Sequence, residues 1–590
     1  MRSCFRSRPG WSIAAAWSIA AACLVATCLV ASGAVADAAN KPEVIAVVAA
    51  DGYADLREQL TWVGEQVGNP TLAGFAESFI LLATQGKGLA GLDVKRPIGV
   101  VITSSGGPLP TAHAFLPVKD LDKLLGAVQG MIGPVEEVDG VRRIAAPGAP
   151  PLEIVEKDGW AIFSQPGDPV GIDDPLTVIE PLTREYSLAI ELFPSRMPAE
   201  MRDRLKALLD EAARNAAAQG QAMDPAQLQA GLERLEDVET IVFGFAVDKL
   251  GDKMMLDLTS VLTPVAVKAA GWVNAGWGNA DNANRAVSTV GAPATTDGKA
   301  AAVRGHYAAT VPAEGQAAVR AALDQALEPA DDDPANRVVT NLLRDLVAAM
   351  LDSGAIDAGL TIDTSAADAT QPLPAVTLGM KVKDGAALEK KVKERLGKAD
   401  ALPPSVKVTF DAGKQGDATL HEITVDVSAL PAADRLGDSV KLTLAVTPQY
   451  AYVLVGGDVP KRLAAALAAG GKPNGDALPI TNVDLSLASL VGYAARMMQA
   501  FNPDDPQGDL LGEIAKQAGE KDTTTVQFSV KPVDRGIALR LSADAGALQT
   551  VAASTAMQQA APPPRARPLT PLRPAQPRQL ENDDTPSIAP

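Results

Sequence analysis

Two stretches with the same pattern decide the expected fold of this chain: VKDLDKLLGAVQGMIG at residues 118–133 and VKDGAALEKKVKERLG at residues 382–397. Each begins with the same three residues, continues with apolar residues at the same offsets and ends on glycine. Apolar residues three and four positions apart indicate an amphipathic helix. The two stretches therefore predict the same helix twice, once in each half of the 590-residue chain.

A second pair of matching segments lies beyond each helix. Residues 160–161 and 167–168 have the same spacing as residues 450–451 and 457–458, and each set pairs an aromatic-Ala step with a later Gly-Asp. The stretch between the two anchors is 40 residues long in the first copy and 66 in the second, so the loops differ in length. We interpret these matches as the duplication of a unit that contains a strand, a helix and three strands.

Asp120 and Asp384 stand where a strand passes into a helix in the two copies. A carboxylate at that position accepts hydrogen bonds from free backbone N–H groups and stabilises the start of the helix. We therefore interpret both residues as helix caps and not as catalytic acids. Gly133 and Gly397 fit the opposite ends of these helices, where a left-handed residue often stops a helix.

Short strand-like and helix-like segments surround both copies, and a chain of this length exceeds one compact core. Their close spacing favours antiparallel pairing. We predict an α+β fold of two related halves, each an antiparallel β-sheet covered by helices. The expected boundaries are a signal peptide at 1–36, an N-terminal α+β domain at 37–264, a junction at 265–300, a C-terminal α+β domain at 301–553 and a disordered tail rich in Pro and Arg at 554–590.

The N-terminal residues have the pattern of a secretion signal. Three arginines with no acid precede an apolar run at 11–35, and small residues follow at the positions that a signal peptidase inspects. We expect cleavage after Ala36 and export to the periplasm or the exterior, with no transmembrane helix in the mature chain. Two alternatives stay open: an uncleaved anchor, because the run is long enough to span a bilayer, and a lipid attached at Cys28.

All three cysteines, Cys4, Cys23 and Cys28, lie within the expected signal. A mature chain without cysteine has no disulfide, thiol catalysis, zinc–thiolate site or iron–sulfur cluster. Its 50 basic and 71 acidic residues give a net charge of −21, because the signal contains three arginines and no acid. Such a surface repels nucleic acid, so we expect no nucleic-acid partner.

The histidines of the mature chain are His113, His306 and His421, which are more than 100 residues apart and lie in strand-like runs. None of them has the spacing of a metal-ligand pair. His421 occupies the place that Arg142 takes in the first copy, which predicts an exposed strand position in both copies. We therefore expect no metal site and no cofactor.

Ser104 and Ser105 form the serine cluster most similar to a hydrolase nucleophile, but the glycine two residues before the serine is missing. We predict a turn between strands at this place. The acidic runs at 331–333 and 504–509 lack the alternating ligands of a calcium loop and are interpreted as solvated linkers. Because Walker and dinucleotide-binding motifs are also missing, we assign no catalytic or cofactor-binding residue.

The C-terminal residues 562–590 contain nine prolines, and their four arginines precede any acid. Proline at this density prevents regular helix or sheet, which predicts an extended, solvated tail. An alternative is an electrostatic tether that binds an anionic wall polymer or the acidic body of the protein.

Short motifs along residues 41–545 resemble large uncharacterised bacterial exported proteins of unknown function. The motifs are Asp93-Val94-Lys95-Arg96-Pro97-Ile98-Gly99, Phe115-Leu116-Pro117-Val118-Lys119-Asp120, Asp158-Gly159-Trp160-Ala161, Gly244-Phe245-Ala246-Val247-Asp248 and Ser353-Gly354-Ala355-Ile356-Asp357. The resemblance implies an exported α+β protein with duplicated strand–helix–three-strand units. It implies no active-site motif.

The missing motifs favour a non-enzymatic binding or scaffolding protein of the envelope, whose partner or ligand is not identified by the sequence. One alternative is a carrier of lipid or another apolar ligand, because a sheet covered by helices can enclose a cavity. A second alternative is a hydrolase that acts on envelope material with carboxylate or serine chemistry.

Overall fold

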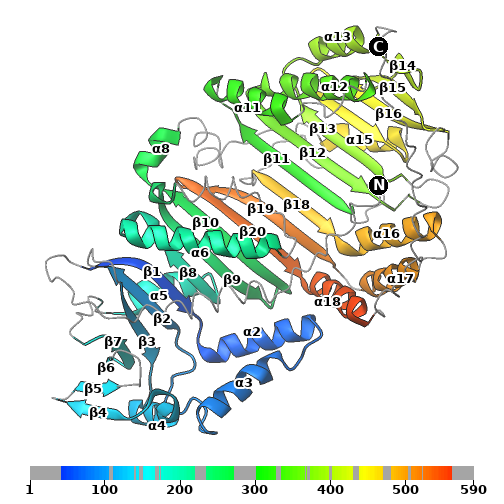
Figure 1. Ribbon diagram of the computed structural model, residues 1–590. Coiled ribbons are helices and arrows are strands. Elements are labelled where there is room, and N and C mark those ends of the chain that lie inside the picture. Colours follow the sequence, from blue (N-terminus) through cyan, green and yellow to red (C-terminus); the bar gives the residue numbers. More distant parts are fainter. Residues whose placement is uncertain are drawn as a thin grey trace, which may run out of the picture.

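The computed structural model shows helices and one antiparallel sheet of twenty strands (Figure 1). It describes residues 42–104, 110–138, 141–144, 151–166, 172, 174–218, 234–270, 301–311, 313–326, 334–365, 367, 373–397, 402–428, 438–469, 480–502, 506–520 and 523–560. The predicted α+β class, with antiparallel strands, is confirmed.

The chain before residue 271 forms the first ten strands. They are β1 (Glu43–Ala50), β2 (Ile98–Ser104), β3 (Thr111–Pro117), β4 (Val135–Val138), β5 (Val141–Ile144), β6 (Leu152–Lys157), β7 (Trp160–Ser164), β8 (Leu188–Leu192), β9 (Val238–Asp248) and β10 (Lys253–Leu262). The helices are α2 (Tyr53–Gln66), α3 (Leu72–Ala83), α4 (Leu121–Ile132), α5 (Leu176–Thr183), α6 (Ala199–Ala218) and α8 (Pro264–Ala270), with short 3-10 turns η1 (Pro194–Arg196) and η2 (Leu235–Asp237).

The chain after residue 300 forms the other ten strands. They are β11 (Val303–Thr310), β12 (Ala355–Asp363), β13 (Ala375–Lys381), β14 (Val406–Gln415), β15 (Ala418–Asp426), β16 (Ser439–Val446), β17 (Tyr450–Val455), β18 (Thr481–Ser486), β19 (Thr525–Val533) and β20 (Gly536–Asp544). The helices are α11 (Ala313–Ala326), α12 (Pro334–Leu351), α13 (Gly385–Leu396), α15 (Val459–Ala469), α16 (Leu487–Phe501), α17 (Pro506–Gly519) and α18 (Ala545–Ala560).

Backbone pairing fixes the order of the strands in space. The first ten have the order β4, β5, β6, β7, β3, β2, β1, β8, β9, β10. The other ten have the order β14, β15, β16, β17, β13, β12, β11, β18, β19, β20. The two orders are the same when ten is added to each strand number.

The seam between the two sets of strands is the pairing of β10 with β20, which joins nine residue pairs. The sheet is therefore continuous from β4 at one edge to β14 at the other, and the expectation of one separate sheet in each half is wrong. An unpaired edge strand leaves a row of N–H and C=O groups open to other chains. Pairing β10 with β20 satisfies two such edges within one molecule.

One face of the seam between β10 and β20 contains a charged pair. Asp257 on β10 lies directly opposite Arg540 on β20, and the guanidinium donates two hydrogen bonds to the carboxylate, at 2.8 and 2.6 Å. Tyr186 donates a third to Asp257, at 3.2 Å. Burial and the nearby Asp257 carboxylate raise the pKa of Tyr186 to about 12, so its hydroxyl stays protonated and remains a donor.

Helices lie on both faces of the sheet towards its two ends, and in Figure 1 α6 crosses in front of the central strands β9, β10 and β20. We name the face that carries α4 near one end, and α12 and α13 near the other, the front face. The rear face carries α5, which packs on β1 and β8, and α15, which packs on β17. Directly paired residues share a face, so the side to which each strand residue points follows from the register.

The repeated sequence segments lie at β3–α4 and β13–α13. Asp120 and Asp384 cap these helices, and each side chain accepts a backbone N–H at 3.0 Å, so the capping prediction is confirmed. Gly133 has a positive φ of 81°, whereas Gly397 has φ −79° and continues the helix with a bond from its N–H to Lys393 O. The left-handed stop expected at Gly397 is therefore wrong.

Four strands, and not three, follow each of these helices. The additional strand in the first copy is β4, a four-residue edge strand that is too short for a pattern. At the expected boundaries, α8 occupies the start of the 265–300 junction, and α18 continues to Ala560, beyond the expected start of the tail. Residues 1–41, 271–300 and 561–590 lie outside the described residues, and so does the expected signal at 1–36.

Candidate functional site

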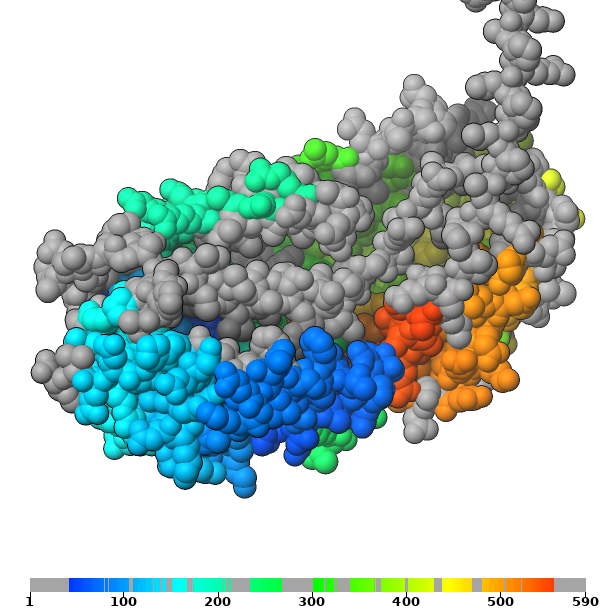
Figure 2. Space-filling view, turned by 60° about the horizontal axis from the view of Figure 1, so that its bottom comes forward, coloured from blue at the N-terminus to red at the C-terminus, as the bar shows by residue number. Residues whose placement is uncertain are grey.

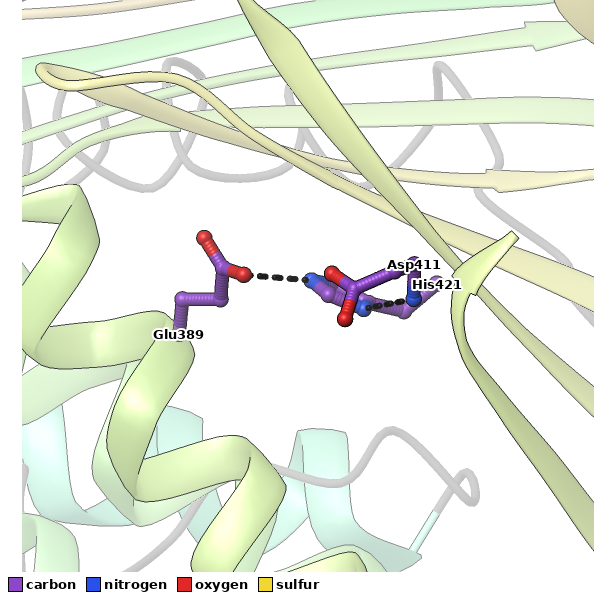
Figure 3. A group of neighbouring side chains, drawn as sticks. All are labelled: Glu389, Asp411 and His421. Carbon is purple, nitrogen blue, oxygen red and sulfur yellow. Dashed lines mark hydrogen bonds and ion pairs between the residues drawn. The ribbon is translucent and has the colours of Figure 1, made fainter. Parts of the chain in front are cut away.

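Among the described residues, Glu389, Asp411 and His421 place one possible metal-ligand atom each within 4.8 Å of one another. Glu389 lies on α13, with Lys393 one turn further along the same side of the helix. Asp411 lies at a bulge of edge strand β14, where the pairing with β15 shifts between Thr409 and Gly413. Figure 3 shows the three side chains converging in the space between helix and sheet.

The bulge of β14 determines which nitrogen of the His421 ring carries the proton. The backbone N–H of Asp411 donates to His421 Nδ1 at 3.2 Å, so the proton of the neutral imidazole is on Nε2. That nitrogen points to Glu389 Oε1 at 3.7 Å, beyond hydrogen-bond distance. The ring is 1% exposed and packs edge-on against Phe410. Burial lowers the pKa of His421, although the Glu389 carboxylate acts against it.

The two carboxylates of this cluster are already bound by Lys393. Its ammonium lies 2.7 Å from Glu389 Oε1 and 2.8 Å from Asp411 Oδ1. The hydrogen bond from Lys393 lowers the pKa of the Asp411 carboxyl, and the same contacts raise the pKa of Lys393. The Asp411 carboxylate and the Lys393 ammonium therefore both stay charged.

These residues do not fit a metal ion. A cation at this place would have to displace the Lys393 ammonium from both carboxylates. It would also need a lone pair on His421 Nε2, which carries the proton as long as Nδ1 accepts the Asp411 N–H. The cluster links the bulge within β14 to α13.

The buried position of His421 corrects the prediction of an exposed strand position. Its register neighbour in β16 is Leu444, which belongs to the core under α12 and α13. Arg142 has the corresponding place in β5, opposite Ile154, and binds Asp122 of α4 at 2.8 Å. Both polar residues therefore point to the front face beneath equivalent helices, a fact that depends on the register and is not visible in the sequence.

The other two histidines lie in strands on the rear face. His306 of β11 places Nε2 at 3.6 Å from Oδ1 of Asp357, a fully buried residue of β12. His113 is buried on β3, opposite Val101 of β2. Both residues lie in strands, as their strand-like sequence runs predict.

The serine proposed as a possible nucleophile is not brought together with a histidine. Ser104 is the last residue of β2, and residues 105–109 lie outside the described part of the chain. Eight strand steps separate β2 from β11 and His306, which is about 38 Å along the sheet. The nearer His113 shares a face with Val101 and Thr103, so the alternation of the strand turns Ser104 to the opposite face.

The acidic runs give no cation site within the described residues. Asp509 lies in the first turn of α17, where a carboxylate interacts favourably with the helix dipole. Residues 331–333 and 503–505 lie outside the described residues.

The largest feature that sequence reasoning missed is an apolar surface in the middle of the sheet. We name the front-facing side chains of β8, β9, β10, β20, β19 and β18 the central apolar face. One row of directly paired residues runs across five of these strands, and all are apolar: Ile190, Phe243, Leu258, Leu539 and Val530. The next row is Leu188, Phe245, Leu256, Leu541, Phe528 and Val483.

The central apolar face is only partly covered. Phe243 is 47% exposed and Phe528 is 37% exposed. The other residues of the two rows are half-buried. Trp62 of α2 and Leu548 of α18 pack against the face at one end, beside Met254. Figure 2 shows α2 and α3 side by side with α18 on that side of the molecule, and Gln549 donates to Gln66 there at 2.6 Å.

No known protein family, no curated protein and no solved structure matches this chain. The described part of the chain contains no helix with the length and apolarity needed to cross a membrane.

Proposed function

We propose that this protein is an exported, non-enzymatic binding protein that holds an apolar chain of a lipid on its central apolar face. The observation that carries the proposal is the exposure of Phe243 and Phe528 within two unbroken rows of apolar side chains. A sheet buries its apolar face against another layer in a stable fold, and a large apolar patch that stays partly exposed marks a binding site. Burying the exposed part of each Phe contributes about 1 kcal/mol.

The dimensions of the face support a chain-like ligand. Six strands span five intervals of about 4.8 Å, or about 24 Å. An acyl chain covers half of a hydrocarbon core that is about 30 Å thick, or about 15 Å. The residues around the two Phe side chains are half-buried.

The charge of the site supports a neutral apolar ligand. The charged residues of the central strands, such as Glu191, Asp257 and Arg540, alternate with the apolar ones and therefore point to the rear face. Ions and sugars need polar partners, which the two rows of the central apolar face do not offer.

The register supports the proposal that the two halves are related by duplication. A row of pairs leads from β7 to β9 through Phe163, Ala114, Val100, Val48, Ile190 and Phe243. The matching row leads from β17 to β19 through Val453, Leu378, Leu360, Gly305, Val483 and Phe528. Phe163 and Val453 each lie three residues beyond the start of a matching sequence segment, at 160 and 450, and the two rows end on the two exposed Phe residues.

A second candidate function, scaffolding, is favoured by α3. Phe75 and Leu82 are 76% and 79% exposed and lie two turns apart on one side of this helix. Exposed aromatic and aliphatic residues on a single helix face are typical of a protein-binding surface.

Native mass spectrometry of the mature protein from its own envelope fraction tests the proposal. We expect a reproducible additional mass in the lipid range that is lost after delipidation. A Phe243→Ser, Phe528→Ser double variant should be recovered without that mass, while the matched double variant Phe75→Ser, Leu82→Ser should retain it. A bare mass, or a mass retained by the first variant, would refute the lipid-binding function, and a stoichiometric protein complex lost in the second variant would support scaffolding.

A further inference from the structure

Phe243 and Phe528 are equivalent residues of the two halves. Each lies on the ninth strand of its ten-strand set and pairs with a leucine of the tenth strand, Leu258 for Phe243 and Leu541 for Phe528. No other phenylalanine lies in the two rows except Phe245 next to Phe243, and that residue is half-buried. Each half therefore contributes one exposed aromatic side chain to the front face.

The seam does not divide these two half-sites. Leu258 pairs with Leu539 and Leu256 pairs with Leu541, so leucines from both halves cover the front face of the seam. The charged pair between Asp257 and Arg540 lies one residue away and points to the rear face. An apolar chain can therefore extend from one half-site to the other without passing a charged group.

The spacing of the half-sites suits two chains that lie side by side. Phe243 and Phe528 are on β9 and β19, which are separated by three strand intervals, or about 14 Å. Strand β10 has ten residues and is about 30 Å long, so an acyl chain of about 15 Å fits along the strands in each half.

We propose that the ligand is a lipid with two acyl chains, one held against each half of the central apolar face. This inference rests on the proposed lipid-binding function and specifies its substrate class. Two chains linked in one molecule bind the second half-site as an intramolecular step, which raises the affinity about 10²- to 10⁴-fold over a single chain. A ligand with two like chains matches two equivalent half-sites that lie on one continuous apolar surface.

The test uses delipidated mature protein and two defined probes, palmitic acid and dipalmitoylphosphatidylcholine, with stoichiometry read by native mass spectrometry. We expect one phospholipid per chain, up to two molecules of palmitic acid per chain, and loss of both palmitic acids when the phospholipid binds. Phe243→Ser and Phe528→Ser should each weaken phospholipid binding at least tenfold and each leave one palmitic acid bound. Val265→Ser, which changes an exposed residue of α8 outside the central apolar face, is the matched control and should bind as the unchanged protein does.

Four outcomes separate this inference from the proposed function. Two phospholipids per chain, or palmitic acid without phospholipid, would overturn the two-chain inference and leave the apolar-chain function standing. Phospholipid binding that only one of the two Phe variants weakens would overturn the inference in the same way. Binding of neither probe would overturn both.

Discussion

The two halves of this molecule have the same strand order but cover the front face differently. In the second half, α12 packs on β12 and α13 with Leu346 only 2% exposed. In the first half, the helix at the same place in the chain, α3, leaves Leu82 79% exposed. Two helices at the same place in the chain thus have opposite environments, although α3 has the more apolar sequence.

The connection that follows each helix explains this difference. Three residues, 352–354, join α12 to β12 and keep the helix against the sheet. Fourteen residues, 84–97, join α3 to β2, and their Leu92 pairs with Val118 and packs against α4. The longer connection fills the place that α12 takes in the other half, so α3 lies outside. An apolar helix pattern therefore shows that a surface needs a partner but not which element provides it.

The largest effect should come from comparing these two helices. Leu346→Ala removes a buried side chain and should reduce the free energy of unfolding by about 3 kcal/mol. Leu82→Ala should change it by less than about 0.5 kcal/mol, because the residue is exposed. Urea unfolding followed by circular dichroism measures both. A destabilisation of similar size in the two variants would show that α3 is packed after all.

The next comparison is between the capping residues of α18, which follows β20, and of α8, which follows β10. Asp544 is buried and accepts backbone N–H groups of Ala547 at 2.8 Å and Thr525 at 2.7 Å. Asp544→Ala leaves both donors unpaired and should cost about 2 kcal/mol. Thr263 caps α8 with one hydrogen bond, to the N–H of Ala266, so Thr263→Ala should cost about 1 kcal/mol. If urea unfolding showed equal losses of unfolding free energy for the two variants, the larger contribution expected of Asp544 would be contradicted.

The charged pair at the seam should make a smaller contribution to the free energy of unfolding. Arg540→Met removes the two hydrogen bonds to Asp257 and should lower the free energy of unfolding by about 1 kcal/mol, since the arginine is 46% exposed and water weakens the pair. The matched control is Arg184→Met, which breaks an exposed pair with Glu180 on α5 and should have almost no effect. If Arg184→Met destabilised the protein as much as Arg540→Met, the charged pair would not stabilise the pairing of β10 with β20.

The smallest effect concerns the pH dependence of stability and comes from the buried ring of His421. Burial lowers the pKa of His421 in the folded protein. As the pH falls below about 6.5, the unfolded chain takes up a proton on this ring before the folded protein does, so stability decreases. The loss should continue until the pH reaches the lower folded pKa, and stability above pH 7 should not depend on this group.

Melting temperatures of the unchanged protein and of His421→Gln between pH 8 and pH 5 measure this contribution. The variant should show a shallower decrease over that interval. Equal slopes would show that the ring is not buried in its neutral form.

The expected elements followed from local patterns in several places. The shared Val-Lys-Asp start predicted both capped helices. The prediction missed β4, since four residues carry no period, and it gave the wrong environment to His421. Alternation shows that neighbouring residues face opposite sides but not which side is covered.

The candidate site was predictable only in part. The sequence shows that residues 241, 243, 245 and 247 alternate as apolar positions of one strand. It does not show that β10 pairs with β20, a contact between residues about 280 positions apart. That pairing converts two short apolar strand faces into one continuous surface.

The sequence by itself determined the capped helices, the spacing of the repeated segments, the acidic charge and the confinement of all three cysteines to the first 28 residues. These depend on residues close together in the chain or on composition alone. The tertiary structure alone decided the single sheet, the exposure of α3, the burial of His421 and the continuity of the apolar surface that contains Phe243 and Phe528. Each of these depends on contacts between distant segments, whose register is set by the packing of the whole sheet.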